Sequence, residues 1–225
     1  MGSPVWIEEW EGVAREILDA TATTTPVCAF ALAKACELEV RPGDVAEAKL
    51  DGNVILYNPK MRLVRQHMRI SHEIGHFGLE RHGLPDSEDG ARHIGGAMLA
   101  PWREMRRDLV ETAWSIPKLR ERHVNVSATA LAIRITQLRD AVVALIDPRD
   151  RKRAWRRPSP WITDPRLSGR PSKFERELAR AAWEAGEEVR GDELCYAVPL
   201  FDETGAGEDR VIVVCELEQL SLRLA

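Results

Sequence analysis

The stretch that decides how this chain is interpreted reads His72-Glu73-Ile74-Gly75-His76. It lies within a run from Lys60 to about Glu80 whose apolar residues follow the spacing of a helix. Two histidines four residues apart on a helix project from the same face, one turn apart. Because neutral imidazole is a good zinc ligand, this spacing predicts a helix that presents two ligands to one metal ion.

The residue after the first histidine, Glu73, would lie beside such a metal ion rather than on it. There a carboxylate can act as the general base for a water whose pKa zinc lowers from about 15.7 toward about 7. We therefore expect a zinc hydrolase with one Zn²⁺ per chain, held by His72 and His76, with Glu73 as the catalytic residue. Gly75 would let a neighbouring strand or a substrate backbone approach closely. The alternative is a helix with two exposed histidines.

A catalytic zinc site needs three protein ligands and one open position, and we expect Glu88 to be the third ligand. Ser87 can cap a new helix after a loop over residues 81–86, and that helix would fold back antiparallel to the first. A glutamate in a first helical turn also interacts favourably with the helix N-terminus, which is the alternative explanation for Glu88. Four other residues compete for the role of third ligand: Asp86, Asp89, His82 and His93.

Up to residue 147 the spacing of apolar residues predicts a mainly helical domain with one small sheet. The expected strand covers residues 54–57, after a turn at Asp51-Gly52-Asn53. The expected helices cover residues 7–20, 26–36, 60–80, a stretch from 88 that Pro101 closes, 115–123 and 127–144.

The rest of the chain has a different composition. Residues 148–171 carry five prolines among many arginines, which predicts a linker. Beyond it, residues 172–225 are expected to form a small α+β appendage of unknown role: a helix over 173–185 and two strands, 194–201 and 210–216, around the turn Thr204-Gly205-Ala206-Gly207. The predicted fold class is therefore α+β, mainly helical, with a metallopeptidase domain over residues 1–147.

Overall composition is that of an ordinary globular protein: 225 residues, 44% apolar, 30% charged and a net charge of -4. The four cysteines lie singly and far apart, as expected of reduced, mostly buried thiols. Residues 1–10 lack a basic patch before an apolar run, and no stretch approaches 18 uninterrupted apolar residues. We therefore expect a cytoplasmic protein with no membrane partner.

Over residues 7–145 the chain resembles the ImmA/IrrE family of metallo-endopeptidases. Arg69-Ile70-Ser71 leads into the His-Glu-x-Gly-His motif as in that family. The second matching stretch reads Glu88-Asp89-Gly90-Ala91-Arg92-His93-Ile94-Gly95-Gly96-Ala97-Met98-Leu99-Ala100-Pro101, in which the glutamate, the alanine, the leucine and the closing proline match.

The resemblance implies a zincin-like core with a small sheet, and an enzyme that cleaves a repressor protein and so frees silenced genes. The expected partner is then a helix-turn-helix repressor of the phage or mobile-element type. Two positions depart from the family pattern. Arg92 stands where the family usually has Asn or Asp, so that support for a ligand histidine must come from another group or be absent. Gly95 replaces an alanine, and two adjacent glycines are expected to loosen the helix.

A second function to weigh is DNA binding. The helices expected within residues 115–144 could form a helix-turn-helix. The stretch 149–157 has six basic residues against one acidic residue and contains Trp155, a combination that can bind a phosphate backbone and stack a base. DNA is the less favoured partner, because the net charge is -4 and because the resembled family often packs a similar helix pair on its peptidase core. A third alternative is a sensory module with weak or no catalysis.

Overall fold

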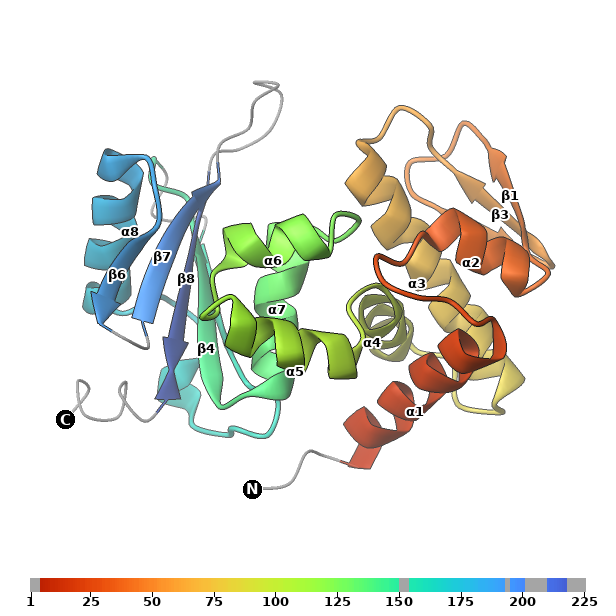
Figure 1. Cartoon of the computed structure of the whole chain (residues 1–225), viewed down its shortest axis with the longest axis horizontal. Coiled ribbons are helices and arrows are strands. Elements are labelled where there is room, and N and C mark those ends of the chain that lie inside the picture. Colours follow the sequence, from red (N-terminus) through yellow and green to blue (C-terminus); the bar gives the residue numbers. More distant parts are fainter. Residues whose placement is uncertain (1–4, 150–153, 193–194, 201–209, 218–225) are drawn as a thin grey trace. The chain divides into compact units, whose positions relative to one another are not determined.

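The computed structural model describes residues 5–149, 154–192, 195–200 and 210–217. The chain divides into two compact units, Ser3–Leu131 and Ala132–Ala225, here called the N-terminal unit and the C-terminal unit. Helices and small sheets together make an α+β protein in which helices predominate, as expected (Figure 1). Across the described ranges, no helix has both the length and the apolar character needed to cross a bilayer.

The N-terminal unit is built on three packed helices, α1 (Val5–Ala20), α3 (Leu63–Arg81) and α4 (Glu88–Leu99) (Figure 1). Helix α3 packs along α4, and α1 contacts both. Each helix is amphipathic and turns its apolar stripe inward, so the core holds fully buried residues from all three: Ile7, Ile70, Ile74, Ile94 and Met98. The shorter helices are α2 (Ala29–Ala35), α5 (Trp102–Glu111) and α6 (Ile116–Arg122).

A three-stranded sheet lies beside α3. Its order is β1-β3-β2, formed by β1 (Glu39–Pro42), β2 (Lys49–Asp51) and β3 (Val54–Tyr57). Strand β1 runs parallel to β3, and β2 runs antiparallel to it through a turn at Gly52. The sequence predicted β3 alone, because β1 and β2 are short and carry few apolar residues.

Glycines bring the backbones of α3 and α4 together. Gly75 faces Ala91 of α4, not the strand or substrate backbone that the sequence suggested. A Cβ on Gly95 would lie 2.8 Å from the carbonyl oxygen of Ser71 on α3. The missing side chain of Gly95 therefore has a packing role that the sequence did not indicate, because it allows the backbones of α3 and α4 to approach closely.

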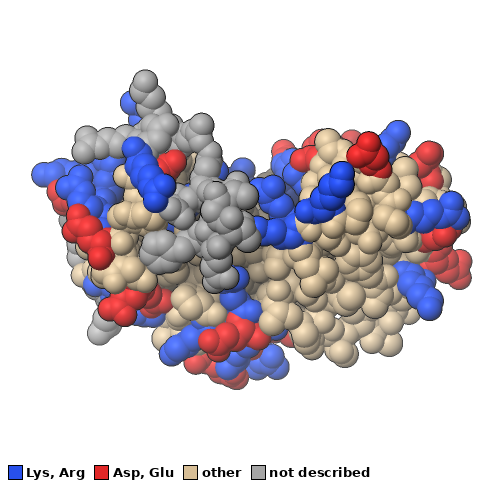
Figure 2. Space-filling view, turned by 90° about the horizontal axis from the view of Figure 1, so that it is seen from above, with Lys and Arg blue, Asp and Glu red and all other residues tan. Residues whose placement is uncertain are grey.

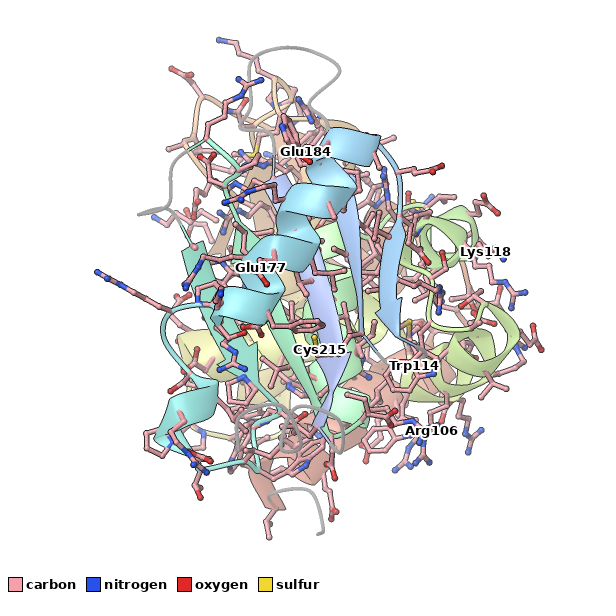
Figure 3. The ribbon with its side chains drawn as sticks, turned by 90° about the vertical axis from the view of Figure 1, so that its left-hand side faces the viewer. Arg106, Trp114, Lys118, Glu177, Glu184 and Cys215 are labelled. Atoms are coloured by element: carbon pink, nitrogen blue, oxygen red, sulfur yellow. The ribbon has the colours of Figure 1, made fainter. Side chains whose placement is uncertain are left out.

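The C-terminal unit is a five-stranded antiparallel sheet with one helix on a face. The strand order is β5-β4-β8-β7-β6. Helix α8 (Lys173–Ala185) lies across the sheet, with Glu177 and Glu184 on the helix and Cys215 on the strand beneath it (Figure 3). The strands are β4 (Ala141–Ile146), β5 (Ala154–Pro158), β6 (Val189–Asp192), β7 (Cys195–Leu200) and β8 (Arg210–Glu216).

The structure corrects two predictions about this part of the chain. Residues 141–146 form β4 instead of the end of a helix; all six are buried, and an apolar run of this length does not distinguish helix from strand. The predicted linker over 148–171 contains β5, which pairs with β4. The C-terminal unit therefore begins near residue 132 instead of 172. The predicted turn at Thr204-Gly205-Ala206-Gly207 lies outside the described residues.

One arginine of the supposed linker is buried in this unit. The Nε of Arg156 donates to Oε1 of Glu175 at 2.8 Å, and its Nη1 donates to the carbonyl of Arg166 at 2.7 Å. The side chains of Arg156 and Glu175 are 2% and 1% exposed. Glu175 also caps α8, since its Oε2 accepts from the Ser172 amide at 2.5 Å. Arg156 thus ties β5 to α8 and is not available for nucleic acid.

Candidate metal centre

His72 and His76 lie one turn apart on α3, as the motif predicts. Their Nε2 atoms are 3.2 Å apart, so both rings turn the same nitrogen toward one point. Both side chains are partly exposed, at 14% and 19%. The two side chains are therefore near the surface, and their Nε2 atoms are close together.

Glu88 reaches the same point from α4. Ser87 caps this helix, as expected, by accepting a hydrogen bond from the Gly90 amide, and Glu88 follows in the first turn. Its Oε2 lies 3.3 Å from Nε2 of His72, and its Oε1 lies 3.6 Å from Nε2 of His76. The close packing of α3 on α4 thus brings together the three residues that the sequence predicts as metal ligands, His72, His76 and Glu88.

The separations of these donor atoms match the chemistry of a zinc site. Ligand atoms at 2.0–2.2 Å from a tetrahedral Zn²⁺ stand roughly 3.3–3.6 Å from one another. Here the two Nε2 atoms are 3.2 Å apart, Oε2 of Glu88 lies 3.3 Å from Nε2 of His72, and the other oxygen, Oε1, lies 3.6 Å from Nε2 of His76. With one atom counted for each residue, the three donor atoms lie within 4.8 Å of one another. Two imidazole nitrogens and one carboxylate oxygen are also a donor set that zinc commonly takes in catalytic sites. The residues present therefore fit the ion.

The other candidates for third ligand have different partners. Asp89 pairs with Arg92 at 2.8 Å, and His82 lies 3.7 Å from Glu16. His93 faces the opposite way, toward α1, where its Nε2 meets Oε1 of Glu11 at 2.8 Å. Asp86 meets Nδ1 of His76, on the far side of that ring from His72. Among the described residues, the donor atoms that gather here come from His72, His76 and Glu88.

Glu73 lies between the histidines and the edge of the sheet. It is 8% exposed, and its Oε2 accepts a hydrogen bond of 2.8 Å from the amide of Leu50 on β2. Burial raises the pKa of Glu73, and the Leu50 hydrogen bond acts in the opposite direction. A carboxylate with a raised pKa holds a proton more strongly than an ordinary one, which suits a group that must accept a proton and pass it on.

Leu50 is the site residue that the sequence interpretation missed. It belongs to β2, which is paired with β3 on one side only, so its amide is free of the strand ladder and turned toward Glu73. The signal that could have identified it was the turn at Asp51-Gly52-Asn53. A turn before a strand implies a partner strand on its other side.

Burial lowers the pKa of His72, and the neighbouring His76 contributes in the same direction. The neutral imidazole is therefore favoured, which is the form that binds metal. An open hollow of about 510 Å³ is lined by Leu50, Glu73, His76 and Asp86 among others. The candidate centre thus combines a carboxylate of raised pKa and a neutral imidazole with an adjoining hollow.

The helix pair suspected of binding DNA has a different character. Helix α6 forms as predicted, and helix α7 (Ala128–Leu138) covers the first part of the helix predicted over 127–144. No side chain of α7 is exposed between its first and last residue. A helix that enters the major groove needs an exposed face for the base edges. On the face drawn in Figure 2, the basic and acidic side chains of the described residues are intermixed.

Comparison with known proteins supplies one finding about the fold. No family model matches the chain, and no curated protein matches it. A solved structure described as "Mycobacterium tuberculosis transcriptional regulator" is similar, with a TM-score of 0.67 and 15% sequence identity. The match covers 95% of this chain and 77% of that chain. At this identity the similarity establishes a shared fold.

Proposed function

We propose that the chain is a zinc-dependent endopeptidase that hydrolyses a peptide bond in a protein substrate. The observation that carries the proposal is the meeting of His72, His76 and Glu88, whose donor atoms lie within 4.8 Å of one another, with the buried Glu73 beside them. A chance cluster of surface acids and histidines gives no reason for a buried carboxylate such as Glu73 to lie next to it.

In this proposal the three ligand residues hold the ion and Glu73 handles the protons. Zinc, when bound, supplies a Lewis acid that polarises a carbonyl and makes water nucleophilic near neutral pH. Glu73 accepts a proton from that water and delivers it to the leaving amine. The Leu50 amide holds Glu73 in place at the edge of the sheet, facing the hollow in which a substrate chain would lie.

The substrate class we propose is a transcriptional repressor of the phage or mobile-element type. Two observations support it: the motif resemblance over residues 7–145, and a structural neighbour that is named a transcriptional regulator. Both are consistent with a protein that acts on gene expression.

The test compares the full-length protein with the Glu73→Gln variant. We expect about one zinc per chain in both by elemental analysis, and cleavage of a mixed peptide library by the wild type alone, detected by mass spectrometry. The loss in rate should be on the order of 10²–10⁴, the usual contribution of a general base. His72→Ala and His76→Ala should lose both zinc and cleavage.

Two results would contradict the proposal. One is a wild-type protein that carries no zinc after purification and takes up none on titration. In that case the short Nε2–Nε2 distance between His72 and His76 is a hydrogen bond and Glu88 a salt-bridge partner. The other is a Glu73→Gln variant that cleaves peptides at the wild-type rate.

The second candidate function is a regulatory role through DNA, favoured by the name of the structural neighbour. The buried α7 and the buried Arg156 weigh against the surfaces first suspected. A gel shift over a salt series separates the two functions. A steep loss of affinity between about 50 and 200 mM salt would indicate phosphate contacts.

A further inference from the structure

Asp86 is bonded to one of the proposed zinc ligands from outside the ligand set. Its Oδ1 lies 2.5 Å from Nδ1 of His76, the ring nitrogen that faces away from His72 and Glu88. An exposed carboxylate accepts hydrogen bonds, so Nδ1 carries the proton and Nε2 keeps its lone pair. Nε2 is the atom that lies 3.2 Å from His72 and 3.6 Å from Glu88. The contact with Asp86 therefore selects the tautomer that a metal ion needs.

The backbone holds Asp86 in place although its side chain is 75% exposed. Helix α3 ends in a reversal at Gly83, whose φ is +65°, and the Leu84 amide bonds back to the carbonyl of Leu79. Immediately after Asp86, Ser87 caps α4. The loop between the two helix ends is short and anchored at both ends, so Asp86 is delivered to the His76 ring at little entropic cost.

Other charged groups nearby do not perform this task. Arg92 cannot accept from an imidazole, because a guanidinium has donors only, and it pairs with Asp89 and Glu88. In the described part of the chain, no carboxylate meets Nδ1 of His72. Among the described residues, the carboxylate contact to a ring Nδ1 thus occurs at His76, through Asp86, and not at His72.

We infer that Asp86 is the positioning residue of the zinc site, orienting His76 and fixing its tautomer from the loop between α3 and α4. This inference rests on the proposed zinc site. A hydrogen-bonded carboxylate behind a ligand histidine raises the basicity of the ligand and holds the ring, and its removal typically costs 10–100-fold in metal affinity.

The test measures metal binding by the full-length protein, with no need for a substrate. Zinc affinity is measured by competition with a chromophoric chelator, and Co²⁺ is added separately to record the visible spectrum of the site. We expect Asp86→Ala to bind zinc about tenfold more weakly or worse and to change the Co²⁺ spectrum. Asp86→Asn, which keeps an oxygen acceptor without the charge, should fall between it and the wild type.

Asp89→Ala is the matched control, since Asp89 is an exposed aspartate three residues along whose partner is Arg92. We expect its affinity to stay within about threefold of the wild type. The melting temperature of the metal-free protein should be the same for Asp86→Ala and the wild type, because the contact is at the surface.

Zinc binding by the variants separates the role of Asp86 from the existence of the zinc site. If the wild type binds zinc, His76→Ala abolishes binding and Asp86→Ala titrates like the wild type, Asp86 does not position the ligand and the zinc site stands. If Asp86→Ala weakens binding no more than Asp89→Ala does, the positioning role is also wrong. A wild type that binds no zinc overturns both proposals.

Discussion

Gly75 on α3 and Ala91 on α4 approach so closely that a Cβ on Gly75 would lie 2.3 Å from the Ala91 carbonyl oxygen. Real side chains do not tolerate such a distance, so any larger residue at position 75 separates the two backbones. Because His72 and His76 stand on α3 and Glu88 on α4, this contact sets the distance between the proposed ligands. The glycine of the motif is thus explained by helix packing.

The adjacent glycines of α4 allow a matched test of this packing. We predict that Gly95→Ala destabilises the fold by about 1–3 kcal/mol, because its Cβ would meet Ser71 and the amide of His72 at 2.8–2.9 Å. Gly96→Ala should be neutral or stabilise by up to about 1 kcal/mol, since nothing lies within 4 Å of its Cβ position. Urea unfolding of both variants measures the difference. Equal effects would show that α3 and α4 can separate at no cost.

The third ligand can be identified by comparing Glu88 with Asp89. Both are exposed acids in the first turn of α4, so either substitution removes a similar interaction with the helix N-terminus, worth about 0.3–1 kcal/mol. We predict that Glu88→Ala loses stoichiometric zinc and that Asp89→Ala keeps it, as measured by elemental analysis after dialysis. If Glu88→Ala retains one zinc per chain, Glu88 is not a ligand, and its role is the favourable interaction with the N-terminus of α4.

His67 should make the stability of the fold depend on pH. Its Nδ1 accepts a hydrogen bond from the Ala29 amide at 3.1 Å, and burial lowers the pKa of His67. The folded protein therefore prefers the neutral ring more than the unfolded chain does. The contribution of His67 to the free energy of unfolding is fully present above its pKa in the unfolded chain, about 6.5. It is lost as the pH falls from there toward the lower pKa of His67 in the folded protein.

We predict that His67→Asn, which keeps an acceptor for the Ala29 amide but does not titrate, reduces the loss of stability between about pH 6.5 and pH 5. Urea unfolding of the metal-free proteins at a series of pH values measures this loss. His72 remains in both proteins and contributes in the same direction, so the readout is the difference between them. Identical slopes would mean that folding does not lower the pKa of His67.

The buried pair of Arg156 and Glu175 should be a main stabilising contact of the C-terminal unit. We predict that Arg156→Met destabilises by about 3–5 kcal/mol, because it leaves Glu175 buried and unpaired. The neighbouring Arg157 is exposed, so Arg157→Met is the control and should change stability by less than about 0.5 kcal/mol. Replacing both members of the pair with apolar residues should recover most of the loss. Equal effects at positions 156 and 157 would restore the view of this stretch as a solvated linker.

Local spacing in the sequence predicted much of the candidate site and of the helices. His72 and His76 are four residues apart on one helix, and Ser87 caps the helix that carries Glu88. These relationships depend on residues within one or two turns of each other, and helical geometry relates them whatever the rest of the fold does. The bounds of α8 and β8 were predicted for the same reason.

Tertiary structure alone decided what surrounds the motif. Leu50 and Glu73 are 23 residues apart, and their hydrogen bond depends on how the sheet is placed against α3. The acid behind His76 is Asp86, from a loop whose course the two helix ends determine. Residues 141–146 became a strand because neighbours on β5 and β8 were available to pair with them. Such contacts join segments distant in the chain, and the pattern of any one segment carries no record of its partner.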